Sequence, residues 1–148
     1  MDADIQELVD QYRLAVAFAR GFIDELGEER AHPVILRAFE SIQVDAARDL
    51  AAELGDNSLE ALAAHYRERA RERDNLEVVE VTDEHVALKI TRCRAFEAFS
   101  YLGVPELCRL YCDSDDAYIK AFNPSMRMIR TKTIAGGDAC CDHTWALE

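Results

Sequence analysis

The sequence predicts an α+β fold in which a helical first half packs with a small antiparallel β-sheet built from two hairpins. Apolar residues recur at helical spacing up to about residue 74, and they alternate over residues 76–91 and again from residue 126 onward. With 148 residues, 49% of them hydrophobic, the chain can build one continuous core. We therefore expect a single domain over residues 1–148, with a helical part over 1–74 and the sheet, further helices and the candidate site over 75–148.

Two long helices are expected first. Over residues 5–26 the apolar positions follow the i, i+3, i+4, i+7 rule, and Gly27 stands where a helix C-cap belongs. After a charged connection at residues 28–30, Pro33 can open the second helix at its first turn, and Gly55 can end it.

The third helix is expected to begin at Asn57, whose side chain can cap it while Glu60 reaches back. Leu62 and Tyr66 belong to its apolar face. Its last turns, residues 67–73, alternate Arg with Glu or Ala, which is typical of a solvated helix face with Glu/Arg pairing.

The period changes at residue 76. Residues 76–81 and 85–91 flank Thr82-Asp83-Glu84 and predict a hairpin. A helix over residues 93–102 then breaks at Gly103, and a second piece opened by Pro105 runs to about Phe122. Residues 126–134 and 140–147 predict a second hairpin around the loop at residues 136–138.

The charge balance excludes several classes of partner. Twenty-nine acidic and 17 basic residues give a net charge of −12, which repels nucleic acid and anionic lipid. No apolar run is long enough to span a bilayer and no signal peptide is visible, so we expect a cytoplasmic protein that acts on small molecules.

Cysteine is absent from the first 92 residues and occurs five times afterwards, at positions 93, 108, 112, 140 and 141. An odd count in a chain without a signal peptide argues against a disulfide framework. The thiols are then buried hydrophobes, nucleophiles or metal ligands. Their spacing is not that of a zinc ribbon, so we expect no cofactor and keep zinc as the alternative.

Strand alternation identifies inward side chains in the second hairpin. Cys141 and His143 share a face with Trp145, which favours burial. In the preceding strand Arg130 and Lys132 share the face of Met126 and Met128. An inward cation needs an anion, and a substrate carboxylate is one candidate. The alternative places Arg127 and Ile129 inward and Arg130 on the surface.

Helical spacing groups further candidates. Cys108 and Cys112 lie four residues apart on the helix opened by Pro105, with Asp115 one turn beyond. Cys93 and Glu97 share the same spacing on the helix before it. A neighbouring His or Arg stabilises a thiolate, and a carboxylate can position water.

An ordered set of motifs carries a resemblance to a known family. It comprises Arg92-Cys93-Arg94-Ala95-Phe96-Glu97-Ala98-Phe99, Leu102-Gly103-Val104-Pro105-Glu106-Leu107, Cys112 with Asp115, Phe122-Asn123-Pro124, Arg130-Thr131-Lys132-Thr133, and Gly137-Asp138 with Cys141-Asp142. Over roughly residues 76–147 the chain resembles the L-2-amino-thiazoline-4-carboxylic acid hydrolase family. The resemblance implies hydrolytic opening of a cyclic C=N/C–S ring that bears a carboxylate, with N-carbamoyl-cysteine as product. After the terminal Cys-Asp the family tends to have Phe and a basic residue, whereas this chain has His143 and Thr144.

The leading hypothesis is therefore a hydrolase. Cys141 or Cys112 attacks the amidine-type carbon as a thiolate, and Asp115 or His143 moves protons and water. An equivalent version has Asp115 activate water directly, while the thiols only shape the pocket. Arg130 holds the substrate carboxylate, and the further candidate binding residues are Lys132, Cys93, Glu97 and Asp142.

A different hypothesis is a sensor domain without turnover. In that case the inward thiols hold a metal ion or report redox state. The apolar faces of the N-terminal helices would then serve to form a homodimer.

Overall fold

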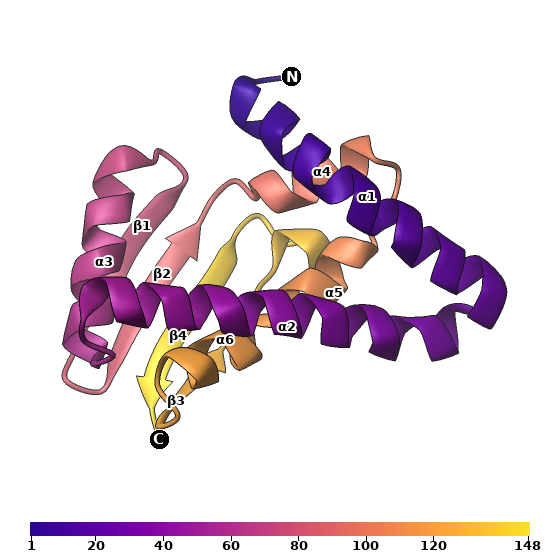
Figure 1. The fold of residues 1–148 in the computed structure, drawn as a ribbon. Helices are drawn as coiled ribbons and strands as arrows, with labels where there is room; N and C mark the ends of the chain where they lie inside the picture. Colours follow the sequence, from indigo (N-terminus) through magenta and orange to yellow (C-terminus); the bar gives the residue numbers. More distant parts are fainter.

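Three N-terminal helices lead into a four-stranded antiparallel sheet in the computed structural model, which describes residues 1–148 (Figure 1). The strand order is β1-β2-β4-β3, so the two hairpins join through β2 and β4. This architecture confirms the predicted α+β class. In chain order the elements are α1 Ala3–Leu26, α2 Glu28–Leu54, α3 Leu59–Glu72, β1 Leu76–Val81, β2 His85–Ile90, α4 Arg94–Tyr101, α5 Leu107–Asp113, α6 Asp115–Phe122, β3 Met126–Ile129, the 3₁₀ turn η1 Ile134–Gly136 and β4 Cys141–Leu147.

The start of α2 differs from the prediction. Gly27, at φ +77°, ends α1, and its carbonyl also accepts the first helical hydrogen bond of α2, from Ala31 N at 2.9 Å. Residues 28–30 are therefore helical and not a connection. Glu28 and Glu29 stand in the first turn, where carboxylates stabilise the positive end of the helix dipole. Pro33 lies inside α2 and does not open it.

Serine residues set two other boundaries that were predicted differently. Ser58, not Asn57, caps α3, because its hydroxyl accepts from Ala61 N at 3.1 Å. Ser114 divides the helix that was predicted to run to Phe122 into α5 and α6. Its fully buried hydroxyl donates to the carbonyl of Tyr111 at 2.6 Å, a local bond that competes with the helical ladder.

The first hairpin has the predicted strands, and the second is shorter than predicted. β3 ends at Ile129, and residues 130–140 form a loop that includes η1. Met126 is buried while Arg127 and Ile129 are exposed, so the alternative with Arg127 and Ile129 on the inner face is wrong. At the centre of the sheet Trp145 pairs with Val86 on one side and Met128 on the other.

Two large hydrophobic clusters hold the fold together, and a small third one, Ile5, Val9 and Ala98, joins α1 to α4. The sheet cluster lies between the sheet and helices α2, α3 and α6, and the helical cluster joins α1, α2, α4 and α5. Figure 1 shows α2 running across both parts of the molecule. Its Phe39 belongs to the helical cluster and its Ala47 to the sheet cluster. None of the helices combines the length and the apolar character needed to span a lipid bilayer.

Candidate functional site

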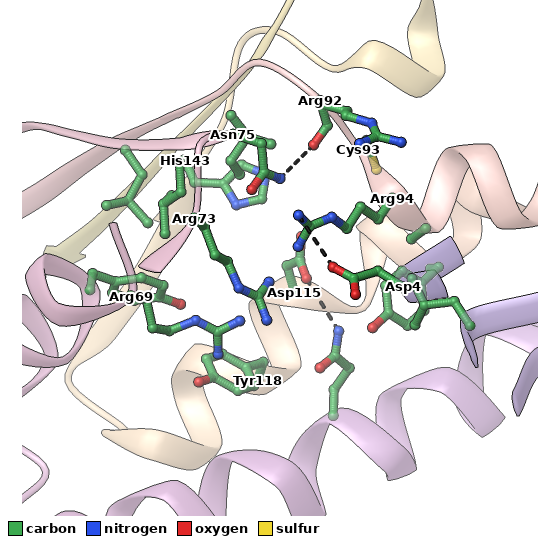
Figure 2. A pocket seen from close by; sticks show the side chains of 18 of the residues that line it. Asp4, Arg69, Arg73, Asn75, Arg92, Cys93, Arg94, Asp115, Tyr118 and His143 are labelled. Carbon is green, nitrogen blue, oxygen red and sulfur yellow. Dashed lines mark hydrogen bonds and ion pairs between the residues drawn. The ribbon is translucent and has the colours of Figure 1, made fainter. Parts of the chain in front are cut away.

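A cavity of about 630 Å³ lies between the two clusters, bounded by α3, the sheet and the N-terminal end of α1 (Figure 2). Gln43 lines it from the middle of α2, between Phe39 and Ala47. Its aromatic wall consists of Tyr66, Tyr111, Tyr118 and Trp145, and its charged side chains are Asp4, Glu7, Arg69, Arg73, Arg92, Arg94 and Asp115.

Three arginine residues, which we call the arginine cluster, point toward one another across the cavity: Arg69, Arg73 and Arg94 (Figure 2). Arg94 pairs with Asp4 at 3.4 Å and with Asp74 at 3.8 Å, whereas neither Arg69 nor Arg73 has an ion-pair partner within 4.0 Å. Burial, and then the positive charges of Arg69 and Arg94, lower the pKa of Arg73. The cluster is thus an excess of positive charge directed into a cavity, which favours an anionic ligand.

The arginine cluster was not predicted, because residues 67–73 looked like a solvated helix face. Arg67 and Arg71 are exposed and lie outside the cavity, as expected, whereas the half-buried Arg69 and the exposed Arg73 line it. A signal for this exists in the sequence: positions 69 and 73 continue, at i+3 and i+7 from Tyr66, the face on which Tyr66 packs inward.

Cys93 caps the N-terminus of α4 and lines the cavity. Its Sγ accepts from the backbone N–H of Phe96 at 3.3 Å. A hydrogen bond from the thiol of Cys108, together with the backbone N–H groups of Phe96 and Ala95, lowers the pKa of Cys93 to about 7 against the opposing effect of burial. A large fraction of Cys93 is therefore thiolate at neutral pH, the form that acts as a nucleophile.

Asp115 begins α6 and also lines the cavity. One carboxylate oxygen accepts from Arg130 at 3.1 Å, and the other accepts from the Gln43 amide at 3.3 Å. Burial raises the pKa of Asp115 to about 7, and the Arg130 charge opposes this rise. A carboxyl group with this pKa can both donate and accept a proton near neutral pH.

His143 reaches the same cavity from β4, where it pairs with Leu88. Burial, and then the positive charge of Arg130, lower the pKa of His143 to about 4, so the imidazole is neutral at pH 7. It packs edge-on against Trp145 with 5.8 Å between ring centroids. The predicted residues Cys93, Asp115 and His143 thus come together in one cavity.

Arg130 points inward, as the strand pattern predicted, but it does not line the large cavity. Its guanidinium donates to the carbonyl of Cys112 at 3.0 Å and to Asp115 at 3.1 Å, and it pairs with Asp113 at 3.5 Å. The anion opposite this inward cation is therefore supplied by the chain itself.

Cys112 lies beside Arg130 in a separate cleft of about 230 Å³, which Asp113, Asp116 and Met128 also line. A hydrogen bond with Cys108 and, more weakly, the charge of Arg130 lower the pKa of Cys112. The single S–H of Cys108 can donate to only one sulfur at a time, so Cys112, which lies outside the large cavity, and Cys93 compete for it.

Cys141 and Asp142 organise the loop at residues 130–140. The Sγ of Cys141 accepts from Ile134 N at 3.2 Å, and burial raises the pKa of this thiol. The Asp142 carboxylate accepts from Thr131 N at 2.8 Å, from Lys132 N at 2.6 Å and from the Thr131 hydroxyl. Neither residue lines the large cavity.

The other predicted binding residues lie outside the cavity as well. Lys132 is exposed, and its backbone, not its ammonium group, takes part in the loop contacts. Glu97 accepts from the Arg92 guanidinium at 2.5 and 2.8 Å. No three His, Cys, Asp or Glu side chains come together in an arrangement that could hold a metal ion.

Comparisons with known proteins agree with the resemblance noted in the sequence. In fold, the chain is similar to the crystal structure of the phenol-responsive sensory domain of the transcription activator PoxR with phenol, at a TM-score of 0.57 and 14% sequence identity over 88% of this chain and 71% of that chain. No curated protein is a significant match in sequence. The family model described as L-2-amino-thiazoline-4-carboxylic acid hydrolase matches residues 9–145. Since this match spans nearly the whole chain, the protein belongs to the L-2-amino-thiazoline-4-carboxylic acid hydrolase family.

Proposed function

We propose that this protein is a hydrolase that opens a small cyclic C=N/C–S substrate bearing a carboxylate. The observation that carries the proposal is that Cys93, with a pKa of about 7, lines the same cavity as the arginine cluster and Asp115. A nucleophile, an anion-binding group and a proton-transferring group then lie within reach of one bound molecule. The hydrolase family to which the chain belongs supports the same reaction class.

The arginine cluster binds the substrate carboxylate, because guanidinium groups match carboxylates in geometry as well as in charge. The N–H groups of an amidine-like ring need acceptors on the opposite side. Asn75 offers one: its Nδ2 donates to the Arg92 carbonyl at 2.8 Å, while its buried Oδ1 has no hydrogen-bond partner. The Asp115 carboxylate offers the other.

Two steps complete the reaction with one water molecule. The Cys93 thiolate attacks the ring carbon between nitrogen and sulfur, the C–S bond of the ring breaks, and Asp115 in its protonated form gives a proton to the departing sulfur. Asp115, now ionised, takes a proton from water, which attacks the same carbon and displaces the Cys93 thiolate. The product carries a new carbonyl oxygen and a free thiol, and the Asp115 pKa near 7 suits both proton transfers.

Mass-spectrometric detection of turnover tests this proposal. Reduced protein is mixed with L-2-amino-thiazoline-4-carboxylate, and the expected product is heavier by one water. We expect Cys93→Ser to lower kcat at least 100-fold. Cys140→Ser, at a cysteine that lines neither cavity, is the matched control and should retain full turnover.

The same assay separates the two versions of the mechanism. Full turnover by Cys93→Ser, together with loss in Asp115→Asn, would show that Asp115 activates water directly and that no covalent intermediate forms. Separate Cys112→Ser and Cys141→Ser variants should keep turnover if Cys93 is the nucleophile. Loss in either of them alone would contradict that assignment.

A second candidate function is a small-molecule-binding domain without turnover. The ring centroid of Trp145 lies 6.2 Å from that of Tyr66 and 6.0 Å from that of Tyr118. The buried Nε1 of Trp145 has no hydrogen-bond partner. An aromatic ligand would suit this wall, and the phenol-responsive sensory domain has a similar fold. Saturable binding of phenol by calorimetry, with no turnover of any carboxylated C=N compound, would favour this function.

A further inference from the structure

We propose that the natural ligand of the large cavity carries two negative charges, as a dicarboxylate or as a phosphoryl compound, and not the single carboxylate of the simplest ring substrate. This inference deepens the proposed function, because it concerns the substrate class of the same cavity. It rests on the arginine cluster, whose positive charge exceeds what one carboxylate neutralises.

The charge excess is unusual for this chain. The protein has a net charge of −12, and yet Arg69, in the last turn of α3, and Arg73, the residue directly after this helix, have no acidic partner within 4.0 Å. The Nε of Arg69 is buried and has no hydrogen-bond partner. Arg69 is half-buried and Arg73 is exposed, so water screens part of the repulsion between their charges, and a bound anion would offset the rest.

The arginine cluster offers two anion positions on different elements. The first consists of Arg69 on α3 and Arg73, the C-cap residue of this helix. The second is Arg94, the first residue of α4 (Figure 2). The Nε of Arg94 is also buried and has no hydrogen-bond partner.

The second position is occupied by the chain itself. Asp4, from the first turn of α1, lies 3.4 Å from the Arg94 guanidinium, and its side chain is 63% exposed. Asp74 lies 3.8 Å from the same guanidinium, and its side chain is 87% exposed. An ion pair with a carboxylate this exposed contributes little stability, so a ligand anion can replace the Asp4 carboxylate. A ligand with two anionic groups fills both positions, whereas a monoanion leaves one of them without a ligand.

Binding of simple anions tests the proposal without any turnover. Trp145 is the single tryptophan of the chain and lines the cavity, so its fluorescence reports occupancy. The Cys93→Ser variant is titrated at low salt with dicarboxylates from malonate to adipate, and with the monocarboxylate of the same chain length in each case. We expect the best dicarboxylate to bind at least ten-fold more tightly than its monocarboxylate.

Titration with inorganic phosphate is the second part of the experiment, and it distinguishes a phosphoryl ligand from a dicarboxylate. Phosphate that binds at least as tightly as the best dicarboxylate would identify a phosphoryl group. Weaker phosphate binding beside a strong dicarboxylate preference would identify two carboxylates. Equal affinities for every matched pair, together with weak phosphate binding, would overturn the proposal.

Variants assign the effect to the cluster. Arg94→Gln should weaken dicarboxylate binding at least ten-fold and monocarboxylate binding less than three-fold, because the monoanion keeps the first position, which no carboxylate of the chain occupies. Arg71→Gln removes the same charge from an exposed position outside the cavity and should change neither. An equal loss in both variants would mean a general charge effect and would contradict the proposal.

Asp4→Asn provides an independent check, because it removes the competing carboxylate and should tighten the binding of every anion. Thermal melting of each variant verifies that it is folded. The outcome is separable from the catalytic proposal, since the ratio of dicarboxylate to monocarboxylate affinity does not depend on Cys93 being a nucleophile.

Discussion

Asp115 and Arg130 form an ion pair in which 3.1 Å separates the carboxylate and guanidinium groups and only 17% of each side chain is exposed. The pair joins the start of α6 to the loop after β3, 15 residues apart in sequence. Arg130 therefore acts on the cavity through Asp115, because its charge opposes the rise in the pKa of Asp115 that burial causes.

We expect Arg130→Met to destabilise the protein, because Asp115 would remain buried without its partner. Removal of one member of a well-buried pair costs about 3–5 kcal/mol, and the partial exposure here reduces this to roughly 2–3 kcal/mol. Urea unfolding at pH 7.5 measures the change. The double variant Arg130→Met/Asp115→Asn should recover part of the loss. A double variant as unstable as the single one would show that the guanidinium acts through other contacts.

The pH dependence of stability should carry opposite contributions from two residues of the cavity. The folded pKa of Asp115, about 7, lies above its ordinary value of 3.8, so its contribution is present at low pH and is lost as pH rises from about 4 to 7. The folded pKa of His143, about 4, lies below its ordinary value of 6.5, so its contribution is lost as pH falls from 6.5 to 4.

Difference curves separate these contributions. The unfolding free energy of the wild type minus that of Asp115→Asn should fall with rising pH over this window, by at most about 1.4 kcal/mol per pH unit. The corresponding difference for His143→Gln should rise with pH. Chemical unfolding at half-unit pH steps gives both curves, and two flat curves would exclude the proton binding inferred for these residues.

Alkylation should identify Cys93 as a reactive thiol with a low pKa. The rate of its reaction with iodoacetamide, followed by mass spectrometry of peptides, should rise with pH to a midpoint near 7. Cys108→Ala removes the main hydrogen-bond donor to Cys93 and should raise this midpoint. Cys141 serves as the internal reference, because burial raises its pKa and it should react more slowly at pH 7. An unchanged midpoint in Cys108→Ala would leave the helix N-terminus as the cause.

Asp142→Ala should loosen the loop at residues 130–140. Its carboxylate accepts three hydrogen bonds from Thr131 and Lys132, each contributing about 0.5–1.5 kcal/mol, so their loss should speed tryptic cleavage after the exposed Lys132. Asp142→Asn keeps an acceptor oxygen and should be cleaved at an intermediate rate. Identical digestion of the wild type and both variants would show that the loop is held by other contacts.

Local patterns predicted the parts of the fold that depend on neighbouring residues. The hairpin around Thr82 follows from alternation and turn residues alone. The start of α2 was predicted wrongly, because Gly27 both ends one helix and begins the next, and Pro33 was a more conspicuous signal. The division at Ser114 depends on burial of its hydroxyl, which no local pattern reveals.

For the site, too, local patterns predicted some residues and missed others. Strand alternation brought His143 inward, and helical spacing pointed to Asp115. The low pKa of Cys93 comes mainly from Cys108 on another helix, so the sequence alone could not distinguish this thiol from the other four. The arginine cluster was missed, because alternating charges along one helix suggested pairing within that helix, whereas Arg94 completes the cluster from 21 residues beyond Arg73.

The path of α2 through both hydrophobic clusters has a consequence for how the molecule unfolds. Phe39 and Ala47 lie on the same continuous helix, so loss of packing in one cluster weakens the helix against which the other cluster packs. We therefore expect the helical part and the sheet to melt in one cooperative transition, with equal calorimetric and van't Hoff enthalpies. The cavity, which lies where α2 crosses from one cluster to the other, would then keep its shape until the whole chain unfolds.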